Sequence, residues 1–344
     1  MTQRSYEQRI AQFAALASLG VVLASGCGSV SPNSLTKGPS GDNTPTGAAV
    51  SSGAQLGLIW NPVDSTLRTL GGVPGSTQLG PPLFPAGSYA AGAFSSPSQT
   101  ALLIDPKGNL QVMVLPSTQP QTVTGNLSPA SVIAFAPRGA YAVVFAPGST
   151  SVLVVGGLPQ APAANVVTAA SAVQSASISD AGTLLLATGA GSGSVSITST
   201  TASGTRSNLA TLGGFGGMSF IAGSEDSLIA DSAANTLARY HNAVATTLAT
   251  HANGLNQPFA VAASMDGHWA VTADQADTVV LRIDLTGAAS PAQSTCACTP
   301  TQLSALNGNA VFELAAPAAT PGWMIEADGP TSRVLFIPPA RGGQ

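Results

Sequence analysis

Four aspartates stand at matching places in four similar stretches of the chain. In each stretch an apolar run ends in Asp, a short polar turn follows, and a second apolar run begins. Carboxylates gathered on one rim can bind a metal cation, an amine or a basic partner. An aspartate at the start of a turn can instead accept hydrogen bonds from the backbone N–H groups of that turn. The four are Asp105 in LLIDPKGNLQVMVL, Asp231 in LIADSAANTLARYH, Asp274 in VTADQADTVVLRID and Asp328 in IEADGPTSRVLFIP.

Turn formation is the favoured interpretation of these aspartates. Two weaker copies of the stretch, at 143–155 and 185–197, carry Ala146 and Gly189 where the others carry Asp. Carboxylates on separate repeats also need not converge within metal-ligand distance, and the three histidines lack the spacing of a zinc site. We therefore predict no metal, no cofactor and no catalytic residue, and at most a loose acidic rim formed by the four aspartates.

The pair Cys296 and Cys298 is a second candidate for chemistry. The spacing of 54 residues from Asp274 to Asp328 exceeds the other spacings, so we expect the two thiols to lie in about a dozen extra residues before the last repeat. In an oxidising compartment they can form a local disulfide, which is the favoured interpretation. Free thiols, or a soft-metal pair that needs further ligands, are the alternatives.

Other residues recur in register with the aspartates. Trp269 and Trp323 each precede an Asp by five residues, and we expect them to pack between repeats. Arg239 and Arg282 each follow an Asp by eight residues, so each can pair with a carboxylate or face solvent. GGFGG at 213–217 lacks the Lys-Ser/Thr of a phosphate-binding loop, and we expect a bend there.

The composition favours a β-protein. Charged residues make up 8% of the 344 residues and aromatic residues 5%, whereas the exposed faces of helices are usually rich in Glu, Lys and Arg. Gly, Ser, Thr and Pro are abundant, as expected of many short strands joined by turns. The net charge of −4 and the lack of Lys/Arg clusters argue against nucleic-acid binding, which requires such clusters.

The N-terminus has the features of a targeting segment. Arg4 and Arg9 precede an apolar run of eleven residues, FAALASLGVVL, which is too short to span a bilayer. The following residues, Leu-Ala-Ser-Gly-Cys, resemble the lipobox of bacterial lipoproteins, although the family's usual Leu three places before the cysteine is Ala24 here. The resemblance implies cleavage of a signal peptide, 1–26, and lipidation of Cys27. An ordinary cleavable signal followed by an unrelated cysteine is the alternative.

Residues 27–54 then predict a flexible tether, because they are rich in Gly, Ser, Pro and Thr and carry almost no large apolar side chain. Gly28 offers no aspartate-type retention signal, which favours the outer membrane over the inner. The chain would thus be anchored to a bacterial envelope membrane by its lipid, with its folded part in the periplasm or at the cell surface.

A repeat of about 42 residues organises the rest of the chain. Asp105 and Asp231 lie 126 residues apart, three periods, and Asp231 and Asp274 lie 43 apart. Six turn-containing hairpins precede the six apolar–turn–apolar stretches, and such a period with several strands per repeat indicates a β-propeller. The last of these hairpins, at Pro317–Gly322, is the loosest match.

One stretch, ASMDGHWAVTADQADTVVLRIDL at 263–285, resembles the repeats of bacterial YVTN-type propellers. We therefore predict one all-β domain, a propeller at 55–340 followed by a tail at 341–344. Six blades are favoured, with seven as the alternative if 55–86 holds a degenerate blade. Residues 56–71 have the pattern of an outer strand pair with no inner pair before it. We expect these N-terminal strands to complete the last blade.

Three functions are compatible with these features. The favoured one is a binding or scaffold module for an envelope protein or glycan, without catalysis. An enzyme such as a lactonase or lyase is allowed by the YVTN resemblance, but it would need His, Arg and Glu residues that converge near the axis. A subunit of an outer-membrane assembly machine is the third.

Overall fold

The computed structural model describes residues 54–339, apart from 192 and 318–319, and all of these belong to the unit Thr46–Gln344. Cys27, the signal peptide, nearly all of the predicted tether and the tail at 341–344 lie outside the described residues. The described chain forms 27 β-strands and a single-turn 3₁₀ helix, η2 (His251–Asn253). None of its helices is long and apolar enough to cross a membrane.

The strands form seven antiparallel sheets, which are the blades of a β-propeller. Blade 1 contains β1 (Gln55–Asn61), β2 (Thr66–Val73) and β3 (Ser76–Pro82); blade 2 contains β4 (Ala91–Ser95), β5 (Thr100–Ile104), β6 (Leu110–Val114) and β7 (Gln121–Thr124); blade 3 contains β8 (Val132–Phe135), β9 (Ala142–Phe145), β10 (Ser151–Gly156) and β11 (Ala163–Thr168); blade 4 contains β12 (Val173–Ile178), β13 (Leu184–Gly191), β14 (Ser194–Thr200) and β15 (Arg206–Leu212).

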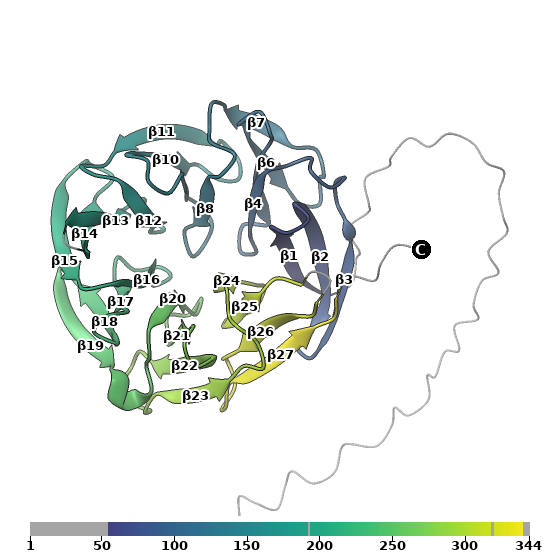
Figure 1. Cartoon of the computed structure of the whole chain (residues 1–344). Helices are drawn as coiled ribbons and strands as arrows, with labels where there is room; N and C mark the ends of the chain where they lie inside the picture. Colours follow the sequence, from purple (N-terminus) through teal and green to yellow (C-terminus); the bar gives the residue numbers. More distant parts are fainter. Residues whose placement is uncertain (1–53, 192, 318–319, 340–344) are drawn as a thin grey trace, which may run out of the picture. The chain divides into compact units, whose positions relative to one another are not determined.

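Blade 5 contains β16 (Phe215–Phe220), β17 (Ser227–Asp231), β18 (Thr236–His241) and β19 (Val244–Ala249); blade 6 contains β20 (Pro258–Ala263), β21 (Trp269–Asp274), β22 (Val279–Asp284) and β23 (Ala292–Thr295); blade 7 contains β24 (Ser304–Ala305), β25 (Val311–Ala315), β26 (Gly322–Glu326) and β27 (Arg333–Ile337). In blades 2–7 the first strand lies nearest the central axis and the fourth lies at the rim (Figure 1).

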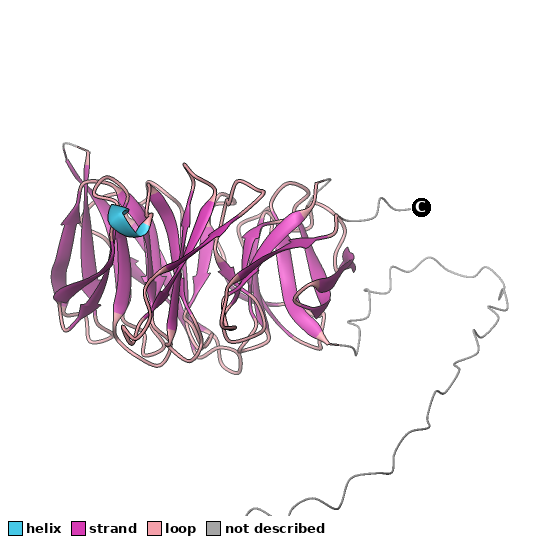
Figure 2. Ribbon diagram, turned by 90° about the horizontal axis from the view of Figure 1, so that it is seen from below, coloured by secondary structure: helices cyan, strands magenta, loops and turns pink. Residues whose placement is uncertain are grey.

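The turns gather at the two faces of the ring, as the edge-on view in Figure 2 shows. We call the face that carries the turns between second and third strands, together with the links from blade to blade, the connection face. The opposite face carries the turns between first and second and between third and fourth strands, and we call it the hairpin face. Antiparallel pairing within every blade enforces this alternation.

The hydrophobic core consists of seven clusters, one between each pair of adjacent blades. The second strands supply much of it because both of their faces meet a neighbouring blade. In β5, TALLI, all five residues are buried, and such a continuous apolar run is typical of a strand covered on both sides. Fully burying one Leu or Ile stabilises the fold by roughly 1.5–3 kcal/mol.

Seven blades, not six, are present, so the favoured blade number was wrong and the alternative was right. Residues 55–82 form a blade of their own. The expectation that N-terminal strands complete the last blade was also wrong, because blade 7 has four strands from its own repeat. Side chains close the ring instead: Leu56, Ile59 and Leu70 of blade 1 pack against Val311, Met324 and Ile337 of blade 7.

Blade 1 is built from strands in the second, third and fourth positions. Residues 56–71 are therefore not the predicted outer pair, because β1 takes the second position and β2 the third. Leu56, at the start of β1, accepts a hydrogen bond from Asn307 on the hairpin face, and Asn61, at its end, donates to Pro317 O on the connection face. β1 therefore runs opposite to the first strands of the other blades. Figure 1 places β1 farther from the centre than β4 and β24.

The last repeat was assigned one strand out of phase. Asp328 follows β26, the third strand of blade 7, so it lies in a turn between third and fourth strands and not between second and third. Pro317–Gly322 correspondingly joins β25 to β26, the second and third strands. Asp328 is the counterpart of Asp284 and not of Asp274, because it lies 44 residues after Asp284 in the same kind of turn.

The presumed dozen extra residues therefore do not exist. The link from blade 6 to blade 7, residues 296–303, has eight residues, as does the link from blade 5 to blade 6, residues 250–257.

Candidate functional site

The four aspartates do not share one rim. Asp105, Asp231 and Asp274 begin turns on the connection face, but Asp328 lies on the hairpin face. There it accepts a hydrogen bond of 2.6 Å from Asn309, which also donates to Asp266 at 2.9 Å. Among the described residues no group of three or more His, Cys, Asp or Glu side chains is arranged to hold a metal ion.

Asp231 holds two parts of the connection face together. Its carboxylate accepts from the backbone N–H groups of Ala233 and Ala234 in its own turn, at 2.9 and 3.0 Å. It also accepts from Gly213 and Gly214 in the link that enters the same blade, at 2.9 and 3.2 Å. Asp231 therefore stabilises its own turn, as expected of a turn aspartate, and it also holds the link from blade 4 to blade 5 in place.

Asp105 has a similar but local role. It accepts from the backbone N–H groups of Lys107 and Asn109 and from the Asn109 side chain, at 2.8–2.9 Å. The hydrogen bonds from Asn109 hold the pKa of Asp105 below its usual value, because they favour the charged carboxylate.

Asp274 occupies the position of Asp231 one blade later, but it is fully buried. Its Oδ2 accepts from the backbone N–H of Asn256 at 2.8 Å, while Oδ1 has no partner within the described chain. Burial raises the pKa of Asp274 to about 6, the bond from Asn256 opposes this, and the nearby charge of Asp277 adds to it. Its inaccessible carboxylate makes Asp274 unsuitable as part of a binding rim.

Only part of GGFGG is the expected bend: Gly213 and Gly214 form the link between blades 4 and 5, whereas Phe215, Gly216 and Gly217 begin β16. Gly216 and Gly217 lie in β16 against β20 of blade 6, and Gly217 has φ of +107°. A Cβ atom on Gly217 would come within 2.8 Å of Ala260 Cα, a distance that side chains cannot tolerate. Glycine is therefore required for the close contact between blades 5 and 6.

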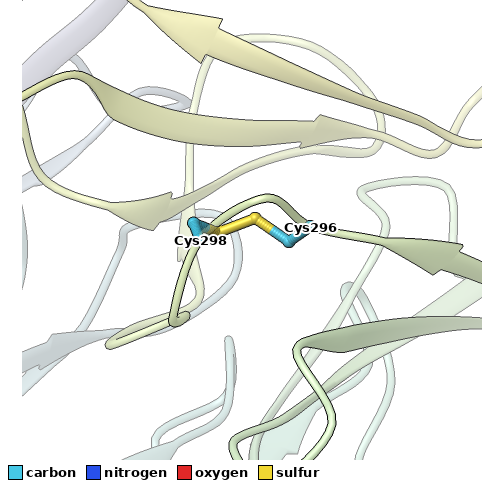
Figure 3. Close-up of a disulfide and its surroundings, with 2 residues drawn as sticks. All are labelled: Cys296 and Cys298. Carbon is cyan, nitrogen blue, oxygen red and sulfur yellow. A yellow bond between two sulfur atoms is a disulfide. The ribbon is translucent and has the colours of Figure 1, made fainter.

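Cys296 and Cys298 are joined by a disulfide in the link from blade 6 to blade 7 (Figure 3), with their Cα atoms 5.0 Å apart. Cys296 is buried and both cysteines pack in the core cluster between these blades. The Cys296 backbone N–H also donates to Thr278 O at 2.8 Å. The disulfide thus constrains the start of the link 296–303. The start of the preceding link, 250–257, contains η2 instead.

Arg282 joins blade 6 to blade 7. It is buried, and its guanidinium donates to the carbonyl oxygens of Ala327, Gly329 and Pro330 at 3.3, 2.5 and 3.0 Å. The same group lies 4.2 Å from the centre of the Trp269 ring, which is a cation–π contact. The expected packing of Trp269 between repeats is confirmed, but Arg282 has neither of its expected partners, a carboxylate or solvent.

The cavity at the centre of the ring has no charged side chain in its described lining. A cavity of about 270 Å³ opens between the innermost strands, and every residue that lines it is apolar or a serine. The lining includes Phe94, Phe135, Phe220, Met218 and Ser219. Nothing in this lining can donate or accept a proton at neutral pH.

A larger hollow lies between blades 5 and 6 on the hairpin face. It is an open groove of about 730 Å³, within the ~300–1,000 Å³ range of ligand pockets. One wall consists of β18 and β19, and the other is the turn after β22, residues 284–291. Its lining presents hydroxyl groups, small side chains and backbone: Thr246, Thr247, Thr286, Gly287, Ala288, Ala289 and Ser290.

Arg239 and His241, in the first wall, both pair with Asp226, which does not line the groove. Asp226 accepts from Arg239 Nε at 2.8 Å and from His241 Nδ1 at 2.6 Å. Burial alone would raise the pKa of Asp226, but these two partners bring it below its usual value. The Nε2 of His241 lies 3.0 Å from the amide nitrogen of Asn242, so both ring nitrogens of His241 have a neighbouring polar group.

The second wall wraps around Asp284. Its carboxylate accepts from the backbone and hydroxyl of Thr286, at 2.8 and 2.7 Å, and from Ala289 N at 3.0 Å. The hydroxyl bond from Thr286 is the main cause that holds the pKa of Asp284 below its usual value. The turn is therefore held in one shape, and Asp284, with 3% of its side chain exposed, offers little to a ligand.

Sequence reasoning missed this groove. The repeat spacing could have identified Asp284 as a turn aspartate, because it stands 44 residues before Asp328. No signal marked the threonines of β19, because the groove forms only when an outer strand of one blade meets a turn of the next.

No protein-family model matches the chain, and no curated protein matches its sequence. Solved structures do resemble it. A functionally unknown protein from Desulfotomaculum acetoxidans has a TM-score of 0.56 at 12% identity, over 83% of this chain and 99% of that one. A streptogramin B lyase has 0.55 at 11%, over 75% and 85%, and a chain of a nidogen/laminin complex has 0.50 at 16%, over 71% and 94%. At such identities the likeness establishes the β-propeller fold alone.

Proposed function

We propose that this protein is a lipid-anchored β-propeller of a bacterial cell envelope that binds a protein or glycan partner in the groove between blades 5 and 6, without catalysis. The observation that carries the proposal is the groove itself, a large hollow on the described surface with preformed walls. The lipobox-like sequence before Cys27 supports the anchor.

The form of the groove suits recognition. Its charged side chains already have partners, so a ligand need not neutralise them. The hydroxyls of Thr246, Thr247 and Ser290 make no hydrogen bond within the described chain, so they are available to an incoming polar group. Hydroxyls can both donate and accept, which suits sugar hydroxyls and peptide backbone alike.

A lyase is the competing function, since two of the similar structures are lyases, the streptogramin B lyase and virginiamycin B lyase from Staphylococcus aureus. An acid–base mechanism needs a titratable group beside the substrate. The channel lining consists of apolar residues and serines, which weighs against catalysis there. The third hypothesis, an assembly-machine subunit, would appear as stable co-purification with membrane proteins.

The binding function can be tested by crosslinking and pull-down from envelope fractions, together with a glycan array. The bait is the full lipidated chain, compared with Thr246→Val/Ser290→Ala, which removes two groove hydroxyls. Thr122→Val, in the exposed outer strand β7 of blade 2, is the matched control. We expect a protein or a glycan that the groove variant loses by about tenfold or more, since two hydrogen bonds disappear, and that the control retains.

Capture that is equal for all three chains would show that the groove is not the site. No partner of either kind would argue against the binding function as a whole.

Anchoring is tested separately. A radiolabelled fatty acid should be incorporated into the wild-type chain and not into Cys27→Ala. Equal labelling of both chains would refute the lipid anchor.

A further inference from the structure

The outermost strand of blade 5, β19, has a free edge beside the groove. Within the described chain β19 pairs with β18 on one side only. Its residues 244–247 are exposed, and Thr246 and Thr247 line the groove. A free strand edge presents backbone N–H and C=O groups, which can pair with a strand of another chain.

The register identifies the backbone groups on this edge. A two-residue turn joins β18 to β19, and both of its residues have positive φ, 49° and 64°. His241 and Val244 flank this turn and stand opposite each other, so they form a hydrogen-bonded pair. Bonded and non-bonded pairs alternate along an antiparallel ladder, so Ala245 and Thr247 direct their N–H and C=O groups away from β18. These four groups make no hydrogen bond within the described chain.

The edge of β19 lacks the features that usually protect an edge strand. Its sequence, VATTLA, contains no charged residue and no proline, and both of these commonly prevent a second strand from pairing. Most of the other outer strands are protected: β3 contains two prolines, β15 and β27 begin with arginine, and β7 and β23 have only four residues. β11, AANVVT, is unprotected as well, but it does not line the groove.

The chemistry of the groove favours an uncharged peptide over a sugar. Its described lining contains no aromatic side chain, whereas the C–H groups of sugar rings commonly pack on the electron-rich faces of aromatic rings. Two charged residues of the lining already have partners, because Arg239 donates to Asp226 and Asp284 accepts from Thr286. A charged side chain of a ligand would therefore lose its water without gaining an unpaired opposite charge.

We propose that the partner supplies an extended, uncharged peptide segment, which adds to blade 5 as a fifth strand by pairing with the free edge of β19. The N–H and C=O groups of Ala245 and Thr247 bond to alternate residues of this segment. Thr246 stands opposite Arg239, and both line the groove, so the peptide residue opposite Thr246 directs its side chain into the groove. The hydroxyls of Thr246 and Ser290 favour a small polar side chain there. This inference rests on the proposed binding function of the groove and specifies a protein, not a glycan, as the partner.

Selection of phage-displayed random dodecapeptides on the full chain tests the inference. We expect the enriched peptides to lack proline in the paired segment and to carry Ser, Thr, Asn or Gln opposite Thr246. An enriched peptide, made synthetically, should bind Ala245→Pro about tenfold or more weakly than the wild type, because the substitution removes an outward N–H. Hydrogen exchange of the Ala245 and Thr247 amides should slow when this peptide binds.

Ala164→Pro, in the unprotected edge strand β11, is the matched control. The Ala169 N–H donates to Thr150 O, so the alternation along the ladder of β10 and β11 directs the Ala164 N–H outward as well. This variant should bind the peptide like the wild type.

A second probe leaves the protein unchanged. N-methylation of the two peptide residues that pair with Ala245 and Thr247 should abolish binding to the wild type, because it removes their donors. N-methylation of the residue between them, whose N–H points away from β19, should not. This comparison keeps the test decisive even if the Ala245→Pro chain does not fold.

Three results would overturn the inference: no enriched peptide, equal binding to Ala245→Pro and Ala164→Pro, or equal binding of the two N-methylated peptides. The proposed function would survive if the glycan array or the envelope pull-down still gave a ligand that Thr246→Val/Ser290→Ala loses. A glycan ligand of that kind would show that the groove binds sugar and not an added strand. If neither experiment gave such a ligand, the proposed function would fail as well.

Discussion

Blades 5 and 6 have the same residue types at equivalent positions, yet those residues have different roles. Asp231 and Asp274 lie 43 residues apart, as do Arg239 and Arg282. In blade 5 the aspartate is partly exposed with four backbone donors, and the arginine pairs with Asp226 near the surface. In blade 6 the aspartate is buried and one of its oxygens has no partner within the described chain, and the arginine is buried against carbonyl groups.

The difference shows that a repeated position determines backbone geometry but not environment. The neighbouring blade decides how deeply a side chain is buried, and burial decides whether a charge stabilises the fold or costs free energy. Four experiments test this contrast, and they follow from the largest expected effect to the smallest.

Arg282→Met should lower the free energy of unfolding by about 2–3 kcal/mol, because Ala327 O loses its charged donor and Trp269 loses its cation. Arg239→Met should cost about 1 kcal/mol at low salt, since 37% of that side chain is exposed. Denaturant titration in 0.05 and 1 M NaCl separates them. The cost at Arg239 should shrink with salt, which screens its ion pair, while the cost at Arg282 should persist. Equal salt sensitivity would contradict the contrast.

Asp231→Ala should cost about 2 kcal/mol, because the N–H groups of Gly213, Gly214, Ala233 and Ala234 lose their common acceptor. Asp231→Asn keeps one acceptor oxygen and should cost less. Thermal unfolding measures both variants. If the alanine variant were as stable as the wild type, Asp231 would not fasten the link into blade 5.

The links that follow blades 5 and 6 also differ, in the interaction that holds each link in place. Residues 250–257 are held by Thr250, which caps η2 by accepting from Ala252 N, whereas 296–303 carry the disulfide. Cys296→Ser/Cys298→Ser should cost about 1–2 kcal/mol, since so short a loop removes little entropy from the unfolded chain. A reductant should lower the wild-type Tm to that of the variant and leave the variant unchanged. If the reductant left the Tm of the wild type unchanged, the disulfide would not stabilise the fold.

Asp274→Asn should stabilise the protein by about 1 kcal/mol at pH 7.5, because it removes a buried charge while Asn256 N keeps an acceptor. The pKa of Asp274 is about 6 when folded and about 4 when unfolded, so folding takes up a proton between these values. This contribution to stability is greatest below pH 4 and is lost as the pH rises through 6. Unfolding followed from pH 4 to 8 should show a steeper decline in the wild type than in Asp274→Asn. Parallel curves would refute the raised pKa.

The sequence predicted the fold well where local signals repeat. The period of about 42 residues and the turn formers identified the propeller and the hairpins of blades 2–6, because each repeat forms its own antiparallel sheet. Prediction failed where the repeat signal weakens. Asp328 stands after an apolar strand like the other three aspartates, and nothing local distinguishes a third strand from a second.

The candidate site was less predictable than the fold. Asp284 and Asp328 hold equivalent positions in successive repeats, so the spacing could have identified Asp284. The groove beside Asp284 could not be predicted in this way, because β19 of the preceding blade forms part of its other wall. Arg282 looks like Arg239 in the sequence, and only the packing of blade 7 against it explains why it binds carbonyl oxygens.

By itself the sequence determined what depends on neighbouring residues: the strands, the tight turns and the aspartates that cap them. These features follow from backbone preferences and hydrogen bonds that span a few residues. Only the tertiary structure decided the number of blades, the closure between blades 7 and 1, the burial of Asp274 and Arg282, and the groove between blades 5 and 6. Each of these arises where two blades meet, and the free energy of that contact depends on residues far apart in the chain.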